Sequence, residues 1–196
     1  MQNKSRGTFI SFEGIDGSGK STQIELVKKY LHKNKKEVLF TREPGGTYEA
    51  ELIRKLILSK NKKTKFDNKT EILLLLAARY EHYKKLIAPA ITNGKIIICD
   101  RFTDSTLAYQ CAGNNELKQF FFQISKSLIN KFEPDLTILL DISPIKALER
   151  INKRKNKNRY DNKNLIFFSN VRKNYNELAQ NNSRIHKLNA LNDKKI

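Results

Sequence analysis

Residues 8–22 read TFISFEGIDGSGKST, and this stretch decides the fold. Residues 8–13 predict a strand, and residues 14–21 match G-x-x-x-x-G-K-[ST] at every fixed position. The glycines let successive backbone N–H groups point into one concavity, and the helix that follows adds partial positive charge at its N-terminus. A strand, this loop and a helix in that order predict a site for nucleotide phosphates.

Each position of the loop has an expected role toward a nucleoside triphosphate. Lys20 can reach the β- and γ-phosphates, and the Ser21 hydroxyl can ligate Mg²⁺. The loop residues expected to contact the nucleotide are Gly14, Ile15, Asp16, Gly17, Ser18, Gly19, Lys20, Ser21 and Thr22. A glycine-rich turn without a ligand is the alternative, and the full match between a strand and a helix disfavours it.

Outward from the loop, strand-like runs alternate with helical patterns. The predicted strands are residues 8–13, 38–41, 95–100, 135–141 and 184–189. The predicted helices are residues 18–32, 49–58, 70–83 with an extension to 91 that is kinked or restarted at Pro89, 120–130, one opening at Pro144, and 165–179. This alternation predicts an α/β fold, a three-layer α/β/α sandwich around a five-stranded parallel sheet. No linker divides the chain, so we expect one domain over residues 1–196.

Composition narrows the class of protein. The chain carries 38 Lys and Arg against 20 Asp and Glu, a formal net charge of +18, but Lys outnumbers Arg by 28 to 10 and the charge is spread along the chain. A solvated surface is therefore favoured over nucleic-acid binding. No apolar run approaches the roughly 20 residues of a membrane helix, and we see no signal peptide. The two cysteines are too few for a disulfide framework and are not spaced as metal ligands, so we expect a cytoplasmic protein. From the charge pattern and the short apolar runs, we expect no nucleic-acid or membrane partner.

A second group of candidate ligand-binding residues begins at Asp100 and Arg101. Both follow a strand, and ligands bind at the carboxyl ends of parallel strands. Asp100 is placed to hold Mg²⁺, and Arg101 to bind a phosphate through two hydrogen bonds. If the next residues are helical, Ser105 and Tyr109 share a face with Arg101.

A second wall of the pocket is expected from residues 70–83. This segment is apolar over most of its circumference, which predicts burial in the core or in a subunit contact. Arg79 within it needs a partner, either a structural carboxylate or a ligand. Glu43 lies in a turn after another strand and faces the same cleft.

Six basic residues crowd residues 150–159, and we expect residues 150–164 to form a lid. The lysines fit a solvated loop. Arginine is scarce in this chain, so Arg150, Arg154 and Arg159 are the candidates for neutralising the charge that develops on a transferred phosphoryl group. A small chain with this loop and no guanine-specific Asn-Lys-x-Asp pattern favours a kinase for a small acceptor.

Together these segments resemble the thymidylate kinase family. The matches are FEGIDGSGKST, FTREPGGT, Ala-Ala-Arg at residues 77–79, DRF at residues 100–102, STLAYQ and DLTILLD. The resemblance implies a homodimer, here assigned to the helix over residues 70–83, that transfers phosphate from ATP to dTMP with Mg²⁺. Another nucleoside-monophosphate or deoxynucleoside kinase remains the alternative, and a non-catalytic nucleotide-binding protein is a more distant one.

The resemblance also implies roles for individual residues. Arg101 would hold the dTMP phosphate, Arg79 would reach the thymine carbonyl, and Tyr109 would pack against the deoxyribose. The base and sugar pocket would be completed by Glu43, Leu75, Ser105, Thr106 and Gln110. Catalytic roles would fall to Lys20, Arg154, Asp16 and Arg101. One branch of the family has a catalytic arginine in the phosphate loop; this loop lacks it, so the sequence resembles the branch that places it in the lid. Arg154 is the match for that role, and Arg159 is second.

The sequence departs from the family pattern in two places. Leu75 stands where the family usually has a phenylalanine that stacks on thymine, so the base would be covered by dispersion without aromatic stacking. The family usually has another helix after the last strand, and the residues after 191 are too few for one.

Overall fold

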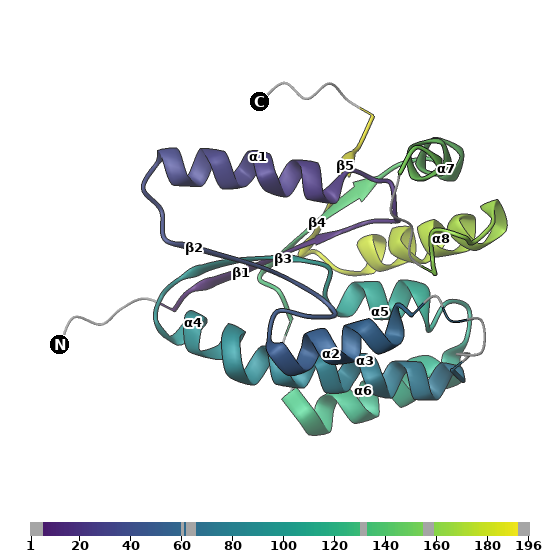
Figure 1. Cartoon of the computed structure of the whole chain (residues 1–196), viewed down its shortest axis with the longest axis horizontal. Helices are drawn as coiled ribbons and strands as arrows, with labels where there is room; N and C mark the ends of the chain where they lie inside the picture. Colours follow the sequence, from purple (N-terminus) through teal and green to yellow (C-terminus); the bar gives the residue numbers. More distant parts are fainter. Residues whose placement is uncertain (1–5, 60, 62–65, 130–132, 155–158, 192–196) are drawn as a thin grey trace.

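A five-stranded parallel sheet forms the centre of the computed structural model (Figure 1), which describes residues 6–59, 61, 66–129, 133–154 and 159–191. The strands are β1 (Thr8–Glu13), β2 (Val38–Arg42), β3 (Ile96–Asp100), β4 (Leu136–Asp141) and β5 (Ile185–Asn189). Their order is β2-β3-β1-β4-β5, with every neighbouring pair parallel. The predicted strand set and α/β class are confirmed.

Helices lie on both sides of the sheet. They are α1 (Lys20–Lys33), α2 (Tyr48–Ile57), α3 (Asn68–His82), the π-helical turn η1 (Tyr83–Ile87), α4 (Ala88–Thr92), α5 (Thr103–Tyr109), α6 (Asn115–Ile129), α7 (Pro144–Asn152) and α8 (Leu165–Asn181). In Figure 1, α1 lies above the sheet, whereas α2 to α6 form a layer below it. No helix among the described residues is both long and apolar enough to cross a membrane.

Strand register places the phosphate loop beside the acceptor segment. Phe12 of β1 pairs with Asp100 of β3, so Gly14 and Arg101 leave neighbouring strands at the same edge. The Arg101 backbone N–H donates to the Phe12 carbonyl at 2.9 Å, and Arg101 takes a positive φ of 72°. This conformation is uncommon for a residue with a side chain, and it turns Arg101 toward the loop.

The predicted extension of the helix of residues 70–83, restarted at Pro89, is confirmed. It runs on through η1, where the Ala88 N–H donates to Tyr83, five residues back, and continues as α4 with Pro89 in the first turn. Another helix differs from the sequence prediction. Helix α6 begins at Asn115, five residues before the predicted start at 120, because the Asn114 side chain accepts from the Leu117 N–H at 3.1 Å. Residues 62–65, and residue 130 at the predicted end of this helix, lie outside the described residues.

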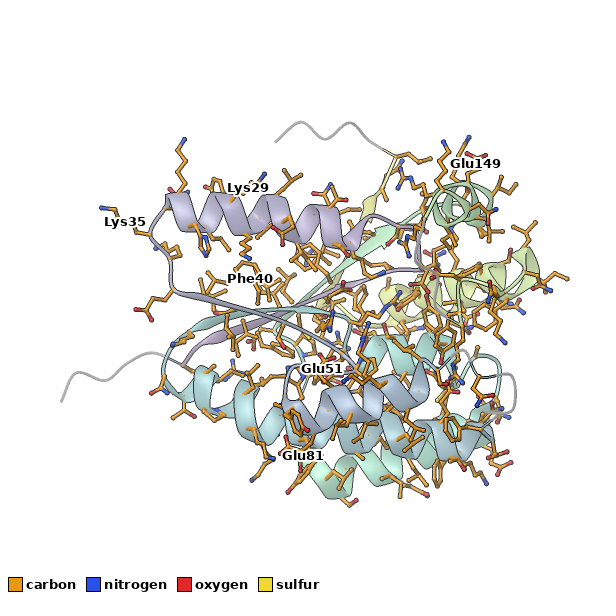
Figure 2. The ribbon with its side chains drawn as sticks, in the orientation of Figure 1. Lys29, Lys35, Phe40, Glu51, Glu81 and Glu149 are labelled. Atoms are coloured by element: carbon orange, nitrogen blue, oxygen red, sulfur yellow. The ribbon has the colours of Figure 1, made fainter. Side chains whose placement is uncertain are left out.

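The two faces of the sheet are covered unequally. Phe9, Ile97 and Cys99 point toward the lower layer and are fully buried. Phe40 and Ile10 point toward α1 and are only half-buried, and Figure 2 shows Phe40 between β2 and α1. Ile98, which pairs with both Phe40 and Ile10, is 1% exposed, so the face toward α1 also contributes to the core.

We predict a contrast between two isoleucine truncations of the same chemistry. Ile97→Ala removes a side chain with no exposed surface and should cost about 2–5 kcal/mol of unfolding free energy, because it leaves a cavity. Ile166→Ala on α8 removes a side chain that is 70% exposed and should change stability by less than about 0.5 kcal/mol. Urea unfolding followed by circular dichroism measures both, and equal losses would contradict the assignment of the core.

Candidate active site

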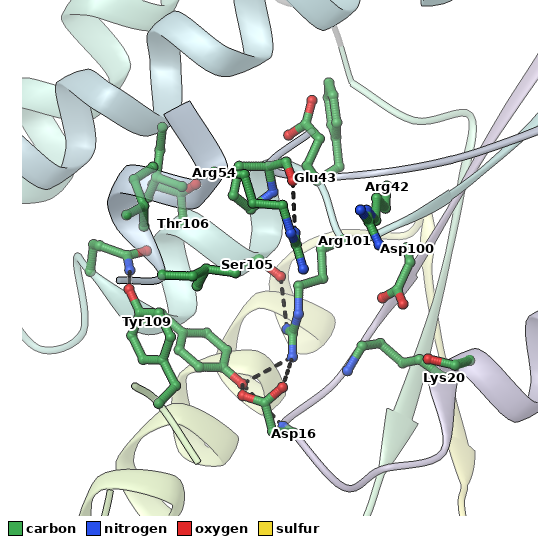
Figure 3. Close-up of a pocket in the computed structure, with 18 of the residues that line it drawn as sticks. Asp16, Lys20, Arg42, Glu43, Arg54, Asp100, Arg101, Ser105, Thr106 and Tyr109 are labelled. Carbon is green, nitrogen blue, oxygen red and sulfur yellow. Dashed lines mark hydrogen bonds and ion pairs between the residues drawn. The ribbon is translucent and has the colours of Figure 1, made fainter. Parts of the chain in front are cut away.

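A cavity of about 300 Å³ opens at the carboxyl ends of β1, β2 and β3 (Figure 3). The predicted site residues that line it are Asp16, Gly17, Gly19, Lys20, Ser21, Thr22, Glu43, Leu75, Arg79, Asp100, Arg101, Ser105, Thr106, Tyr109, Gln110 and Arg154. Gly14, Ile15, Ser18 and Arg150 are not among the lining residues. The structure therefore brings the phosphate loop, both expected walls and one lid arginine to one cavity.

Arg101 lies at the centre of the cavity. Its guanidinium donates to Asp16 Oδ1 at 2.9 Å, to the Gly14 carbonyl at 3.0 Å and to the Ser105 hydroxyl at 3.1 Å. The Tyr109 hydroxyl lies 3.2 Å from it, and its guanidinium carbon is 5.0 Å from the centre of the Tyr109 ring. Ser105 and Tyr109 lie one turn apart on α5 as predicted, whereas Arg101 precedes that helix with a positive φ of 72° and reaches them through these contacts.

Asp16 joins the loop to this cluster. It accepts from the Tyr109 hydroxyl at 3.0 Å, while its own backbone N–H donates to that hydroxyl at 3.1 Å. Burial raises the pKa of Asp16, but Arg101 and Lys20 outweigh burial, so the net pKa lies below its usual value. Asp16 is therefore an ionised partner for the two cations.

Lys20 is the buried cation of the phosphate loop. Its ammonium donates to the carbonyls of Gly14 at 3.0 Å and Ile15 at 3.3 Å. Burial, followed by the positive charge of Arg101, lowers the pKa of Lys20 to about 8, against the opposing effect of Asp100. Lys20 and Arg101 thus donate to the same carbonyl, that of Gly14, from two sides.

Glu13, the last residue of β1, is a buried acid that sequence reasoning did not assign to the site. It has no exposed surface, and it accepts from the Phe102 N–H at 2.6 Å, from Ser105 at 2.6 Å and from Tyr175 of α8 at 2.8 Å. Burial, followed by the charge of Asp104, raises the pKa of Glu13 to about 7. Its place immediately before the loop, as the charged residue of that strand, was the available signal.

Arg79 has found a carboxylate partner. Its Nε donates to Glu43 at 2.7 Å and one terminal nitrogen donates to Thr106 at 3.0 Å, while His82 lies 3.0 Å from the other Glu43 oxygen. The other terminal nitrogen, NH1, is buried without a hydrogen bond. Of the two alternatives left open for Arg79, the carboxylate accounts for part of the guanidinium, and one nitrogen stays available to a ligand in the cavity.

The far end of the cavity is closed by the lid and by α3. Gln110 donates to Glu71 at 2.7 Å and to the Tyr160 hydroxyl at 3.0 Å. Arg159 forms an ion pair with Glu71 and does not line the cavity. Glu71 and Tyr160 were not predicted, because nothing in their local sequence distinguishes them from surface residues.

The other lid arginines take different positions. Arg154 lines the cavity and lies 3.4 Å from Asp161. Arg150 donates to the Gly17 carbonyl at 3.2 Å and to the Ala190 carbonyl at 3.4 Å, so it braces the outside of the phosphate loop. Lys155 and Lys157 of the predicted lid lie outside the described residues.

A divalent cation has one suitable carboxylate here. Asp100 Oδ1 is buried without a hydrogen-bond partner, and in Figure 3 the Asp100 carboxylate lies near Lys20. The described residues contain no group of three His, Cys, Asp or Glu side chains that could hold a metal alone. This arrangement fits Mg²⁺, which usually takes one or two protein ligands and completes its shell with phosphate and water.

Two further arginines, Arg42 and Arg54, line the cavity, although neither was assigned to the site from the sequence. Arg42 pairs with Glu51, and Arg54 donates to the Pro44 carbonyl at 2.7 Å. Burial, followed by repulsion from Arg42, lowers the pKa of Arg54. The scarcity of arginine was the signal that could have identified both.

A parallel sheet in this order, a phosphate loop after β1 and an arginine-lined acceptor wall define a P-loop nucleoside-monophosphate kinase. The family model for thymidylate kinase matches residues 12–196. The chain therefore belongs to the thymidylate kinase family, a family of phosphotransferases that phosphorylate dTMP.

Individual relatives agree. The chain is 46% identical over 177 residues to a thymidylate kinase from Geobacillus sp., covering 89% of this chain and 84% of the relative. It is 44% identical over 177 residues to one from Orientia tsutsugamushi, covering 87% and 79%. A crystal structure of thymidylate kinase from Ehrlichia chaffeensis superposes with a TM-score of 0.73 at 35% identity, covering 93% of each chain.

The raised pKa of Glu13 predicts a pH dependence of stability. A carboxyl group whose pKa is about 7 in the folded chain and about 4.5 when exposed binds more protons in the folded than in the unfolded chain between these two pH values. Its contribution to the unfolding free energy should therefore fall as pH rises from about 4.5 to 7. Glu13→Gln cannot titrate, so its stability relative to the parent should improve across that range. Denaturant unfolding of both proteins at pH 5, 6, 7 and 8 measures the difference, and a constant difference would contradict the raised pKa.

Proposed function

We propose that the chain transfers the γ-phosphoryl group of ATP to the phosphate of dTMP, giving dTDP and ADP. One observation carries the assignment of donor and acceptor sides: Lys20 and Arg101 donate to the Gly14 carbonyl, each at 3.0 Å. If Lys20 bound one phosphate and Arg101 bound a second in place of this carbonyl, the two phosphates would lie side by side. Phosphoryl transfer needs such an arrangement, since its catalysis consists mainly of positioning and neutralisation of charge.

On the donor side, the backbone of residues 14–22 cradles the phosphates and Lys20 moves from the loop carbonyls to the β- and γ-phosphates. Mg²⁺, held by Ser21 and Asp100, would screen the charge of the phosphates. Arg150 supports the loop through Gly17. Arg154 supplies positive charge to the transferred group when residues 150–164 close as a lid, and closure excludes water as a competing nucleophile.

On the acceptor side, Arg101 binds the dTMP phosphate and exchanges part of its contact with Asp16 for it. The buried free nitrogen of Arg79 donates to a thymine carbonyl, while Glu43 and Thr106 hold the rest of its guanidinium. Leu75 covers the base and Tyr109 packs against the deoxyribose. Ser105 acts through Arg101, and Gln110 closes the base end of the pocket.

The chain works as a homodimer through α3, in this proposal. Leu73 of α3 is 45% exposed, and Leu52, Leu56 and Phe122 on the neighbouring α2 and α6 are also about half exposed. Helix α3 packs against both of these helices. A second copy of the chain would bury these apolar side chains. Separately, a cytoplasmic location fits the two free, buried cysteines.

The function is tested by coupled ADP release across dTMP, dUMP, dCMP, dGMP, AMP and thymidine. We expect dTMP to give the highest kcat/KM. A higher value for another monophosphate would favour the alternative of a different nucleoside-monophosphate kinase. A higher value for thymidine would favour a nucleoside kinase, against the role given to Arg101.

The two acceptor arginines should fail differently when they are truncated. Arg101→Ala removes the phosphate contact, so it should raise the KM for every monophosphate by about tenfold or more. Arg79→Ala removes a base contact, so it should reduce the preference for dTMP over dCMP. Steady-state kinetics with both acceptors measures the two effects. An unchanged preference together with lower thermal stability would make Arg79 only the structural partner of Glu43.

Arg154→Ala should lower kcat about 10²-fold with a modest change in the KM for ATP, because its contact strengthens in the transition state. Arg154→Lys should not restore kcat, since an ammonium cannot replace the planar guanidinium. Lys153→Ala, one residue away in the same segment, is the control and should change only the salt dependence. Equal losses in all three variants would mean that the lid acts as a diffuse positive charge.

A further inference from the structure

The buried acid Glu13 reaches the same guanidinium nitrogen of Arg101 through two hydroxyl groups. Ser105 and Tyr175 each lie within hydrogen-bond distance of a single Glu13 oxygen, at 2.6 and 2.8 Å. The same two hydroxyls lie 3.1 and 3.2 Å from NH1 of Arg101. The other Glu13 oxygen accepts from the backbone N–H of Phe102, the residue that follows Arg101.

We propose that Glu13 is a positioning residue for the acceptor phosphate, acting on Arg101 through Ser105 and Tyr175. The proposal rests on the proposed role of Arg101 and deepens it. Glu13 is fully buried and cannot touch the substrate, so its effect must pass through these neighbours. Tyr175 is also buried, and it brings α8, 74 residues away along the chain, into the acceptor site.

The count of protons explains why a carboxylate is needed. Ser105 and Tyr175 have one hydroxyl proton each, and their oxygens also lie 2.8 Å from each other. The ionised Glu13 oxygen is the one member of this triangle that can only accept, so it draws both hydroxyl protons to itself. The lone pairs of the two hydroxyl oxygens then face Arg101, which can only donate. Glu13 thereby makes both hydroxyls acceptors for Arg101 and also holds the backbone that gives Arg101 its positive φ.

Glutamine at this position has nearly the same shape and the opposite effect. The Phe102 N–H would keep the amide oxygen on its side, so the amide nitrogen would face Ser105 and Tyr175. The two hydroxyl protons would lose their common acceptor, and Arg101 would lose a nearby negative charge. Arg101 would then be held less firmly in the orientation that meets the phosphate.

The experiment compares the KM values of the two substrates at pH 8, where Glu13 is ionised in the parent chain. Glu13→Gln should raise the KM for dTMP about tenfold and leave the KM for ATP within about twofold. Tyr175→Phe removes one of the two hydroxyls and should raise the KM for dTMP by a smaller factor, about threefold. Ser11→Ala is the matched control, because Ser11 is a fully buried polar residue of the same strand whose hydroxyl bonds Thr137 at 2.8 Å. It should leave both KM values unchanged.

Arg101→Ala and the double variant with Glu13→Gln separate this proposal from the function it rests on. If Glu13 acts through Arg101, adding Glu13→Gln to Arg101→Ala should raise the KM for dTMP no further. An unchanged dTMP KM in Arg101→Ala would overturn the role of Arg101 itself. A raised KM in Arg101→Ala beside an unchanged one in Glu13→Gln would overturn only the positioning role. So would equal rises in both KM values, or a rise in Ser11→Ala. If Glu13→Gln does not fold, Tyr175→Phe decides, and an unchanged dTMP KM would then overturn the proposal.

Discussion

The parallel pairing of β1 with β3 is the constraint on which the rest of the site depends. Because Phe12 lies opposite Asp100, the phosphate loop and the acceptor arginine begin at the same edge of the sheet. The backbone hydrogen bond from Arg101 to Phe12 fixes that alignment at its last point. A shift of the register by one residue would turn Glu13 to the opposite face of the sheet and separate Arg101 from the loop.

The charged side chains of the cavity are largely buried, and oppositely charged residues pair with one another there. Asp16 balances Arg101, and Glu43 balances Arg79 with His82 beside it. Buried charges without partners would be costly, so Asp16 and Glu43 are each held against an arginine from another element. The polar atoms left without partners are correspondingly informative: Asp100 Oδ1 and the free nitrogen of Arg79 both belong to residues that line the cavity.

The five strands, their parallel arrangement and most of the cavity were predicted from the sequence. The cavity was predictable because the phosphate loop and the Asp100-Arg101 pair directly follow strands, and the ends of parallel strands lie at the same edge of the sheet. The sequence did not predict Tyr175 or Glu71, since both come from helices that reach the site only through tertiary packing. The role of Arg150 toward the nucleotide stays a prediction, and its side chain donates to the Gly17 carbonyl of the loop. Helical spacing correctly placed Ser105 and Tyr109 on one face of α5, but Arg101 precedes that helix, and spacing could not show that Ser105 also bonds Glu13.

The buried ammonium of Lys20 has a thermodynamic consequence for the proposed donor site. With a pKa near 8, an appreciable share of the chains carries a neutral amine in mildly alkaline buffer. The negative charge of a bound triphosphate would favour the protonated form, so nucleotide binding draws a proton from the solvent. The heat of binding then includes the ionisation heat of the buffer. Titration calorimetry in Tris and in HEPES at pH 8 would give different apparent enthalpies for the same complex.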